Sequence, residues 1–279
     1  MSQIELNSST KKIPIAIISI FFLSISMKLI FFNPDVPVVM DSLNTFSFAT
    51  DIHVLGYLPN EYLDPKPGWP IFLSFFFSIF DFNNTESYMQ LQKFLTVLIS
   101  SLTIFPLYFL SKKFFNSKYS LIGLVIFAVE PRLLENSLLG GTDSLFILVI
   151  VITLVLFFSN TKFIFLSFLS VGLAVIIRPE GIFLFFSMMI MLIFKLKKQK
   201  QPFLKYVIAI GIFILILLPI SLHAEKMPNT ESIFSRIINS FNNLLDSKPS
   251  PNNDSESKMS SNDSVSLISG VVNYSKFLG

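Results

Sequence analysis

The stretch IPIAIISIFFLSISMKLIFF, residues 13–32, is an apolar run of about 20 residues near the start of the chain. A helix of about 20 apolar residues spans the hydrocarbon core of a bilayer. Lys11 and Lys12 precede the run as they would in a signal peptide, but such a peptide has a shorter apolar region and small cleavage-site residues. Asn33-Pro34-Asp35 offers no such site. The run therefore predicts an uncleaved membrane span.

The composition of the whole chain extends this prediction. Hydrophobic residues make up 52% of the 279 residues, charged residues only 14%, and Phe alone occurs 33 times. The mean hydropathy is +0.66. Because a soluble domain carries about 25% charged residues, the chain lacks the polar surface that a soluble globule needs. We expect an all-α polytopic membrane protein.

The same composition excludes several kinds of site. The chain has no cysteine, which rules out disulfides, thiolate catalysis and cysteine-based metal centres. With only His53 and His223, a histidine metal cluster is not expected either, so we predict no metal site. The net charge is +3, and the basic residues are scattered between apolar runs. This pattern argues against nucleic-acid binding.

Seven spans are expected between a cytoplasmic N-terminus, residues 1–12, and a polar C-terminal tail, residues 223–279. The segment between the first two spans, residues 33–87, is a long outer loop, and within it 70–80 is too short to cross a bilayer. We expect 70–80 to be an interfacial or re-entrant helix. The predicted spans are 13–32, 88–111, 119–139, 144–158, 163–178, 181–194 and 206–222, which together form a transmembrane domain over 13–222.

The lysines predict which side of the membrane each loop occupies. Alternate connections carry clustered lysines, whereas the connections between them carry mostly Asp and Glu. The positive-inside rule then places the N-terminus in the cytoplasm and the acidic loops outside. The lysines assigned to the cytoplasmic side are Lys11, Lys12, Lys112, Lys113, Lys118, Lys162, Lys195, Lys197, Lys198, Lys200 and Lys205.

Several of the spans are short and end in charged residues on the outer side. The apolar part of the third span, 119–129, measures about 16 Å as a helix, about half of a hydrocarbon core. The span must therefore continue through Glu130-Pro131-Arg132, where Pro131 breaks the helix. Gly140-Gly141-Thr142-Asp143 and Arg178-Pro179-Glu180-Gly181 flank two further short spans. Since charges inside a membrane face a polar environment, we expect an outward-facing polar cavity.

Asp41 opens the first outer loop, Lys66-Pro67 lies further along it, and Arg178-Pro179-Glu180-Gly181 follows a later span. In this order the residues resemble the GT-C membrane glycosyltransferases, in particular the protein O-mannosyltransferase and lipid A aminoarabinose transferase group. DIHVLG (51–56), GWPIFLS (68–74) and EPRLLENS (130–137) are similar to archaeal members. The resemblance covers residues 13 to about 222. It implies transfer of a sugar from a polyprenyl-phosphate carrier to an acceptor outside the cytoplasm.

Asp41 is the candidate general base, because a carboxylate within hydrogen-bond reach of an acceptor hydroxyl can take its proton. The alternative is that Asp41 caps the first outer helix. The family usually carries a second acid directly after the first, and here that position is Ser42. With Leu43 at the next position, the chain also lacks an Asp-x-Asp site for a divalent ion.

Lys66 and Arg178 are the candidates for binding the donor phosphate. Lys66 precedes a proline as in the aminoarabinose transferases, where the resemblance implies a contact with the lipid phosphate; a solvated or headgroup contact is the alternative. The guanidinium of Arg178 matches phosphate oxygens in pairs. Its alternative role is a structural clamp with Glu180 or Asp143.

Further candidates for lining the cavity have structural alternatives of their own. Glu130 is either a second cavity acid or a partner for Arg132 or Lys28, and Asp143 is either functional or a helix cap. Trp69 suits an aromatic belt at the interface, with sugar stacking as a second role. The full set is Asp51, Glu130, Arg132, Asp143, Glu180 and Trp69.

A glycosyltransferase is therefore the expected function, and a transporter or flippase of a lipid-linked or small anionic solute is the alternative. Transporters usually show repeated halves with broken helices at matching positions, which this chain lacks. No cofactor is expected beyond the lipid-linked sugar donor, and the acceptor is a protein, lipid or glycan. The expected location is the plasma membrane, with the active face outside. Residues 265–279 read as the approach to another span, which suggests a C-terminally truncated product.

Overall fold

The computed structural model describes residues 3–38, 41–59, 66–80, 82–159, 163–196 and 202–224. Within these ranges the chain is helical apart from short connections and contains no strand, which confirms the all-α prediction. The helices are α1 (Gln3–Ile30), α2 (Asp41–Leu55), α3 (Gly68–Ile79), α4 (Thr85–Leu102), α5 (Ile104–Ser111), α6 (Ser117–Val129), α7 (Pro131–Leu138), α8 (Asp143–Phe158), α9 (Ile164–Ile177), α10 (Gly181–Leu196) and α11 (Pro202–Ala224).

Long apolar helices identify an integral membrane protein. In the described ranges, three helical stretches are long and apolar enough to cross a bilayer: Ile13–Ile30, Thr85–Ser111 and Leu204–His223. The other apolar helices are shorter, and whether each of them crosses the membrane stays a prediction. Most of the predicted polar tail, residues 225–279, lies outside the described residues, as do Lys162, Lys197, Lys198 and Lys200.

The outer surface of these helices is apolar. Phe194 is 74% exposed, Leu215 69% and Ile126 61%. Large exposed apolar surfaces are unfavourable in water but carry no such cost against lipid tails. The surface therefore agrees with the membrane assignment that the helix lengths give.

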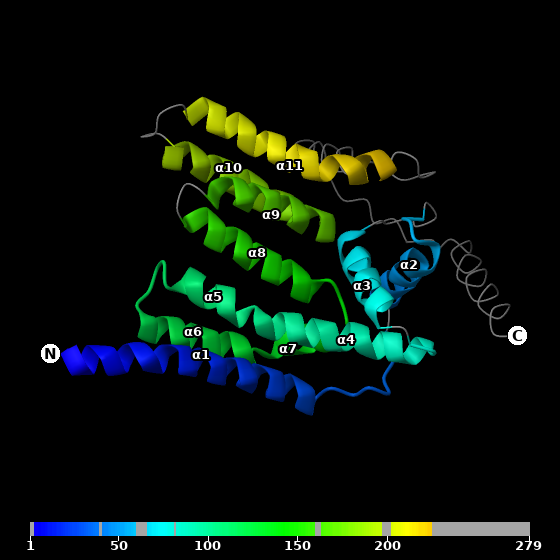
Figure 1. Cartoon of the computed structure of the whole chain (residues 1–279), viewed down its shortest axis with the longest axis horizontal. Coiled ribbons are helices and arrows are strands. Elements are labelled where there is room, and N and C mark those ends of the chain that lie inside the picture. Colours follow the sequence, from blue (N-terminus) through cyan, green and yellow to red (C-terminus); the bar gives the residue numbers. More distant parts are fainter. Residues whose placement is uncertain are drawn as a thin grey trace, which may run out of the picture. The chain divides into compact units, whose positions relative to one another are not determined.

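Helices α8 to α11 lie together in Figure 1, and α9 is the central member, which packs against α8, α10 and α11. Their shared core consists of buried aromatic and aliphatic side chains, including Phe168 and Phe213. Gly172 of α9 allows α11 to approach closely, because a Cβ at this position would lie 2.8 Å from Cγ2 of Ile216. Small residues at such contacts are a usual feature of helix packing in membranes.

Helices α2 and α3 lie against each other, next to the ends of α8 and α9 (Figure 1). Phe46 and Trp69 are fully buried in the core that they share with α4 and α8. Gly68 starts α3 directly against the end of α9, since an added Cβ would lie 2.8 Å from Ile177. The predicted helix at 70–80 is thus present, and it is fixed to the bundle by its first turn.

The predicted helix break at Pro131 is confirmed. Helix α6 ends at Val129, and α7 begins at Pro131, which needs no N–H partner in a first turn. Glu130 takes the N-cap position between them, and its Oε2 accepts a 2.6 Å hydrogen bond from the backbone N–H of Leu133. The break turns the chain so that α7 leads toward the start of α8.

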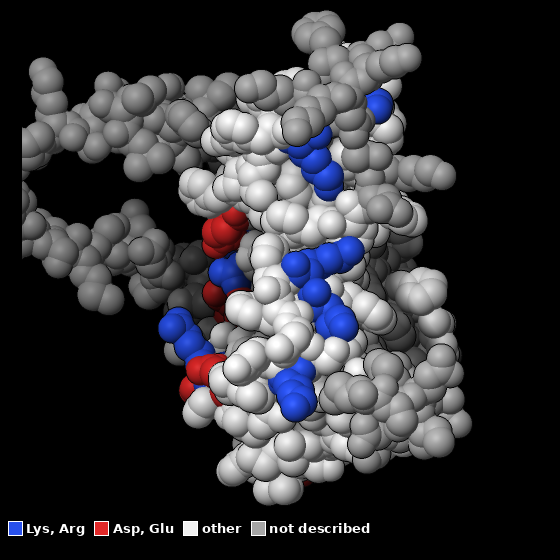
Figure 2. Space-filling view, turned by 90° about the vertical axis from the view of Figure 1, so that its left-hand side faces the viewer, with Lys and Arg blue, Asp and Glu red and all other residues white. Residues whose placement is uncertain are grey.

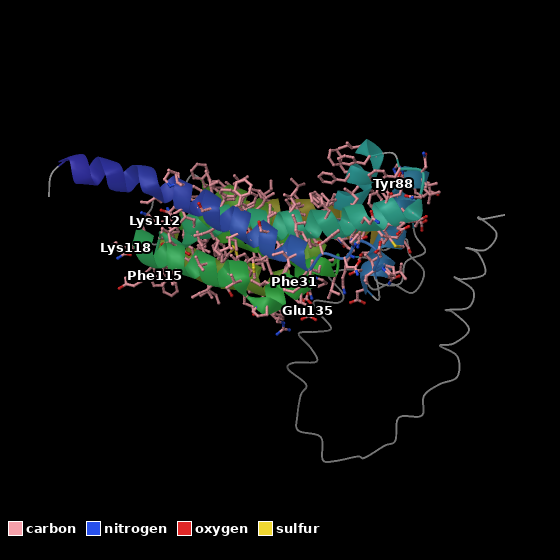
Figure 3. All side chains as sticks on the ribbon, turned by 90° about the horizontal axis from the view of Figure 1, so that it is seen from below. Phe31, Tyr88, Lys112, Phe115, Lys118 and Glu135 are labelled. Carbon is pink, nitrogen blue, oxygen red and sulfur yellow. The ribbon has the colours of Figure 1, made fainter. Side chains whose placement is uncertain are left out.

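The charges are unevenly distributed along the bundle. Figure 2 shows basic side chains on the end that carries the α5–α6 turn and the last turn of α10, and the basic residues of these turns are lysines. Lys112 and Lys118 lie at that end in Figure 3, whereas Glu135 lies toward the opposite end. The predicted grouping of these lysines on one side is therefore matched by their position along the helices.

Candidate active site

A cavity of about 350 Å³ opens at the Asp143 end of α8, opposite the end where Lys195 contacts Phe157. Asp41, Lys66, Asp143 and Arg178 all line it. These four residues come from the first turn of α2, the segment before α3, the first turn of α8 and the end of α9. The helix ends thus bring together charged groups that are far apart in the sequence.

Asp41 is the first residue of α2 and is exposed to the cavity. The positive end of the helix dipole favours a carboxylate there. Among the described residues, no α2 amide donates a hydrogen bond to the Asp41 side chain, so a capping bond of the kind expected for the alternative role is not seen. The Asp41 side chain therefore lines the cavity from the first turn of α2.

Arg178 ends α9 in an extended conformation, with its backbone N–H bonded to the carbonyl of Ala174 at 2.9 Å. Its guanidinium forms ion pairs with both carboxylates considered for it: Nη1 with Oδ1 of Asp143, and Nη2 with Oε1 of Glu180 at 3.3 Å. The guanidinium also lies 5.6 Å from the ring centre of Phe146. The arrangement of the structural clamp is therefore present, on a side chain that also lines the cavity.

Gly181 makes the turn after Arg178 tight. Its N–H donates to the carbonyl of Arg178 at 3.0 Å, and a Cβ at Gly181 would lie 2.8 Å from the backbone nitrogen of Val175. A larger residue would push this turn away from α9. The glycine thus helps to hold the guanidinium at the wall of the cavity.

Two cations of the cavity lining act on the carboxyl group of Glu180. Partial burial acts to raise the pKa of Glu180, but a backbone hydrogen bond, Arg178 and Lys66 together hold it below its usual value. Lys66 is half-buried and acts on Glu180 through its charge. Lys66 and Arg178 therefore contribute to one local positive field.

Asp143 begins α8, directly after Thr142 at the N-cap position. Its carboxylate is 36% exposed and forms the ion pair with Arg178. The same residue also borders a second, much smaller cavity together with Asn136 and Ser144. Asp143 is thus the one among the six additional candidates that lines the main cavity.

The other five candidates lie elsewhere. Trp69 is fully buried under the cavity, and its Nε1 donates to the carbonyl of Gly140 at 3.2 Å instead of facing an interface. Glu130 caps α7, and Arg132 and Asp51 are exposed away from the lining residues. Glu180 is not a lining residue, but it pairs with Arg178, which is one.

Lys28, the other partner considered for Glu130, is bound to hydroxyl groups. It is fully buried between α1 and α4, and its Nζ donates to the Oγ atoms of Ser24, Ser100 and Ser101 at 3.0, 2.9 and 3.3 Å. Three hydroxyl acceptors satisfy the three N–H bonds of the ammonium group. Lys28 is thus bonded to serines and not to Glu130, and Glu130 caps α7.

Three uncharged polar residues of the cavity were missed in the sequence. Asn44 and Thr45 line the cavity next to Asp41, and Asn136 lines it from α7. Asp41, Asn44, Thr45 and Phe48 follow the i, i+3, i+4, i+7 spacing of one helix face. With a helix that starts at Asp41, this spacing predicts that Asn44 and Thr45 share the helix face of Asp41.

Comparison with known proteins identifies the family. The family model of the dolichyl-phosphate-mannose-protein mannosyltransferases matches residues 64–223, more than half of the chain. The matched segment contains Lys66, Asp143 and Arg178, whereas Asp41 precedes it. A search of curated proteins finds no significant match. The chain belongs to the dolichyl-phosphate-mannose-protein mannosyltransferase family and is thus a membrane glycosyltransferase of the GT-C type.

Proposed function

We propose that the protein transfers a sugar from a polyprenyl-phosphate donor to a hydroxyl group of an acceptor on the extracytoplasmic side, with Asp41 as the general base. The observation that carries this proposal is the shared cavity of Asp41, Lys66 and Arg178. It combines a carboxylate able to accept a proton with two cationic groups suited to a phosphate. Family membership supports a lipid-phosphate donor and makes mannose the first sugar to test.

The reaction needs one bond to form and one to break. The acceptor oxygen attacks the anomeric carbon of the sugar, and the bond from that carbon to the phosphate oxygen breaks, leaving the electron pair on the phosphate. Asp41 takes the proton of the attacking hydroxyl group. A positioned carboxylate of this kind contributes about 10²- to 10⁴-fold to the rate.

The leaving phosphate gains negative charge as the bond breaks, so cations next to it lower the barrier. Arg178 presents two nitrogens, each of which is shared with a carboxylate in this structure. The Glu180 carboxylate is 53% exposed and lies at 3.3 Å, so it is the partner that a phosphate displaces more easily. Lys66 adds a second positive charge on the same wall.

The position of the cavity supports the proposed side of the membrane. It lies at the Asp143 end of α8, whereas the turn that follows Lys112 lies at the other end of α8, where Phe114 contacts Phe158. Because lysine-rich turns favour the cytoplasm, the cavity then opens outside. The uncharged side chains of Asn44, Thr45 and Asn136 offer hydrogen-bond partners to the sugar and the acceptor.

The proposal is tested by reconstituting the protein in vesicles with a polyprenyl-phosphate-linked mannose and following both donor consumption and transfer to an added acceptor fraction. Asp41→Asn should reduce transfer at least about 100-fold. Asp51→Asn is the matched control, because it removes an exposed acid from the same helix outside the cavity lining. Wild-type transfer by Asp41→Asn would disprove the assignment of the base, and solute flux without sugar transfer would disprove the proposed reaction.

A further inference from the structure

Gln92 lies in α4, outside the cavity lining, yet it contacts two of the cavity walls. The side chain is fully buried. Its Nε2 donates one hydrogen bond to the backbone carbonyl of Ser42 at 3.1 Å and a second to the carbonyl of Gly140 at 2.7 Å. One primary amide has two N–H bonds, so this group is fully used as a donor.

Each of these carbonyls belongs to a segment that carries a charged residue of the site. Ser42 follows Asp41 in the first turn of α2. Gly140 starts the connection that ends at Asp143, which pairs with Arg178. The Gln92 amide therefore joins the segment of the proposed base to the segment of the proposed phosphate site.

A second buried donor strengthens the same junction. The indole Nε1 of Trp69 bonds to the carbonyl of Gly140 at 3.2 Å. This carbonyl accepts from both Trp69 and Gln92, so helices α3 and α4 both fix the position of the Gly140 connection. A carbonyl with two lone pairs can accept both bonds.

The backbone around Gly140 is shaped for this contact. Its φ of +75° lies in the left-handed region, which favours glycine at the end of a helix. A Cβ at Gly140 would also lie 3.2 Å from Cγ1 of Val38 and 3.4 Å from Nε2 of Gln92. Gly141 continues the close approach, with its Cβ position 3.6 Å from Oγ of Ser42. The first turn of α2 and the Gly140–Gly141 connection thus lie close together, and Gln92 is bonded to both.

We propose that Gln92 is a positioning residue that sets the separation between Asp41 and the Asp143–Arg178 pair. The effect on catalysis rests on the proposed function, but the effect on the separation of the two walls does not. Few other side chains suit this place. An ionised Glu has no donor for two carbonyl groups, and Met has the length but no hydrogen-bond donor. In a buried, water-poor site both carbonyls would then lose a partner.

The separation of the walls can be measured directly, because the chain contains no cysteine. Spin labels are attached to Leu43→Cys in α2 and Leu139→Cys at the end of α7, both at exposed positions. The distance distribution is recorded in the full-length protein in lipid nanodiscs. Gln92→Met should broaden it, and the shorter amide of Gln92→Asn should broaden it less.

Thr153→Val is the matched control. Thr153 is also fully buried, and its Oγ1 forms a 2.8 Å bond to Ser170 between α8 and α9, away from the cavity. This variant should leave the distance distribution unchanged. The control is needed because the loss of any buried hydrogen bond in the bundle can broaden the distribution. If Thr153→Val leaves it unchanged, the broadening is specific to the loss of the Gln92 bonds.

Kinetics of the unlabelled variants supply the second readout. Gln92→Met should lower kcat about 10- to 100-fold, as misplacement of reacting groups by about 1 Å does, while the donor KM changes little. Wild-type kcat and an unchanged distance distribution in both Gln92 variants would overturn the inference. A broadened distribution together with no sugar transfer in any variant, wild type included, would support the positioning role and reject the proposed function. If Gln92→Met fails to fold, Gln92→Asn gives the same comparison.

Discussion

The helices α9 to α11 and the walls of the cavity are held together in different ways. The first region is held by close apolar packing. Gly172 lets α11 approach α9, and the ring centroids of Phe185 and Phe213 stack 3.8 Å apart. The second relies on buried donors, such as the amide of Gln92 and the indole of Trp69. Since lipid gives no hydrophobic drive between helices, close packing and polar contacts must supply the specificity.

We therefore expect substitutions in one region to change mainly the stability of the protein and substitutions in the other to change mainly its kinetic constants. In the α9–α11 region, the core side chains are apolar and none of them lines the cavity, so damage around Gly172 should lower stability without changing the chemistry of folded molecules. In the cavity region, polar contacts fix the position of charged groups, so damage should appear in the kinetic constants. Substitutions in the two regions can test this division.

The largest effect in donor binding is expected from Arg178→Gln. Losing one charge-assisted contact to a phosphate should raise the donor KM about 10- to 100-fold. Arg178→Lys keeps the charge but loses the paired nitrogens, so an intermediate value is expected. The donor KM is measured by initial rates in vesicles, with the exposed Arg132→Gln as the control.

The same variant distinguishes the two roles considered for Arg178. If the guanidinium is only a clamp between Asp143 and Glu180, the thermal midpoint of unfolding will fall while the donor KM of the folded fraction stays at its wild-type value. That result would remove Arg178 from the phosphate site and would place it with the structural contacts.

Gly172→Ala tests the apolar region. The new Cβ would lie 2.8 Å from the Ile216 side chain, and overpacking of this kind costs about 1–3 kcal/mol. The thermal midpoint of the protein in nanodiscs should therefore fall, with kcat per folded molecule unchanged. Gly211→Ala is the control, because its Cβ would meet no atom within 4 Å. A reduced kcat in folded Gly172→Ala would show that the two regions are coupled.

The smallest effect is expected from Glu180→Gln. Removing this carboxylate leaves the positive charges of Lys66 and Arg178 less compensated. The donor KM should therefore fall, by about two-fold, in keeping with the small free energy of an exposed ion pair. Because its surroundings hold the pKa of Glu180 below its usual value, the carboxylate stays charged at pH 5 and above. The difference from wild type should thus be constant from pH 5 to 8, and a difference that vanishes at pH 5 would contradict this charge state.

Local signals in the sequence predicted much of this structure. Pro131 predicted the break between α6 and α7, and the short spans with charged ends predicted a polar cavity. The two carboxylates considered for Arg178 are both its partners. These features depend on neighbouring residues or on rules for charges in membranes, which a single sequence contains.

Contacts between distant segments could not be read in the same way. Trp69 was expected at the membrane interface, but it is buried because α3 packs against α2. Its indole Nε1 donates to the carbonyl of Gly140. Gln92 was not singled out, although Gln92, Thr96 and Ser100 form a polar stripe along α4 that continues to its C-cap, Thr103. The stripe shows a polar face, but the distant carbonyls that it meets, those of Ser42, Ser137 and Gly140, are brought there by the packing of other segments.

The proposed roles of Asp41 as the base and of the cavity cations as donor ligands can be told apart by measuring donor binding and sugar transfer separately in one variant. Equilibrium binding of polyprenyl-phosphate-linked mannose and kcat are measured for wild type and Asp41→Asn. If Asp41 is the base, Asp41→Asn should bind the donor within about two-fold of wild type and have a kcat reduced about 10²- to 10⁴-fold. A wild-type kcat in Asp41→Asn, or a loss of donor binding large enough to explain the lost activity, would contradict it.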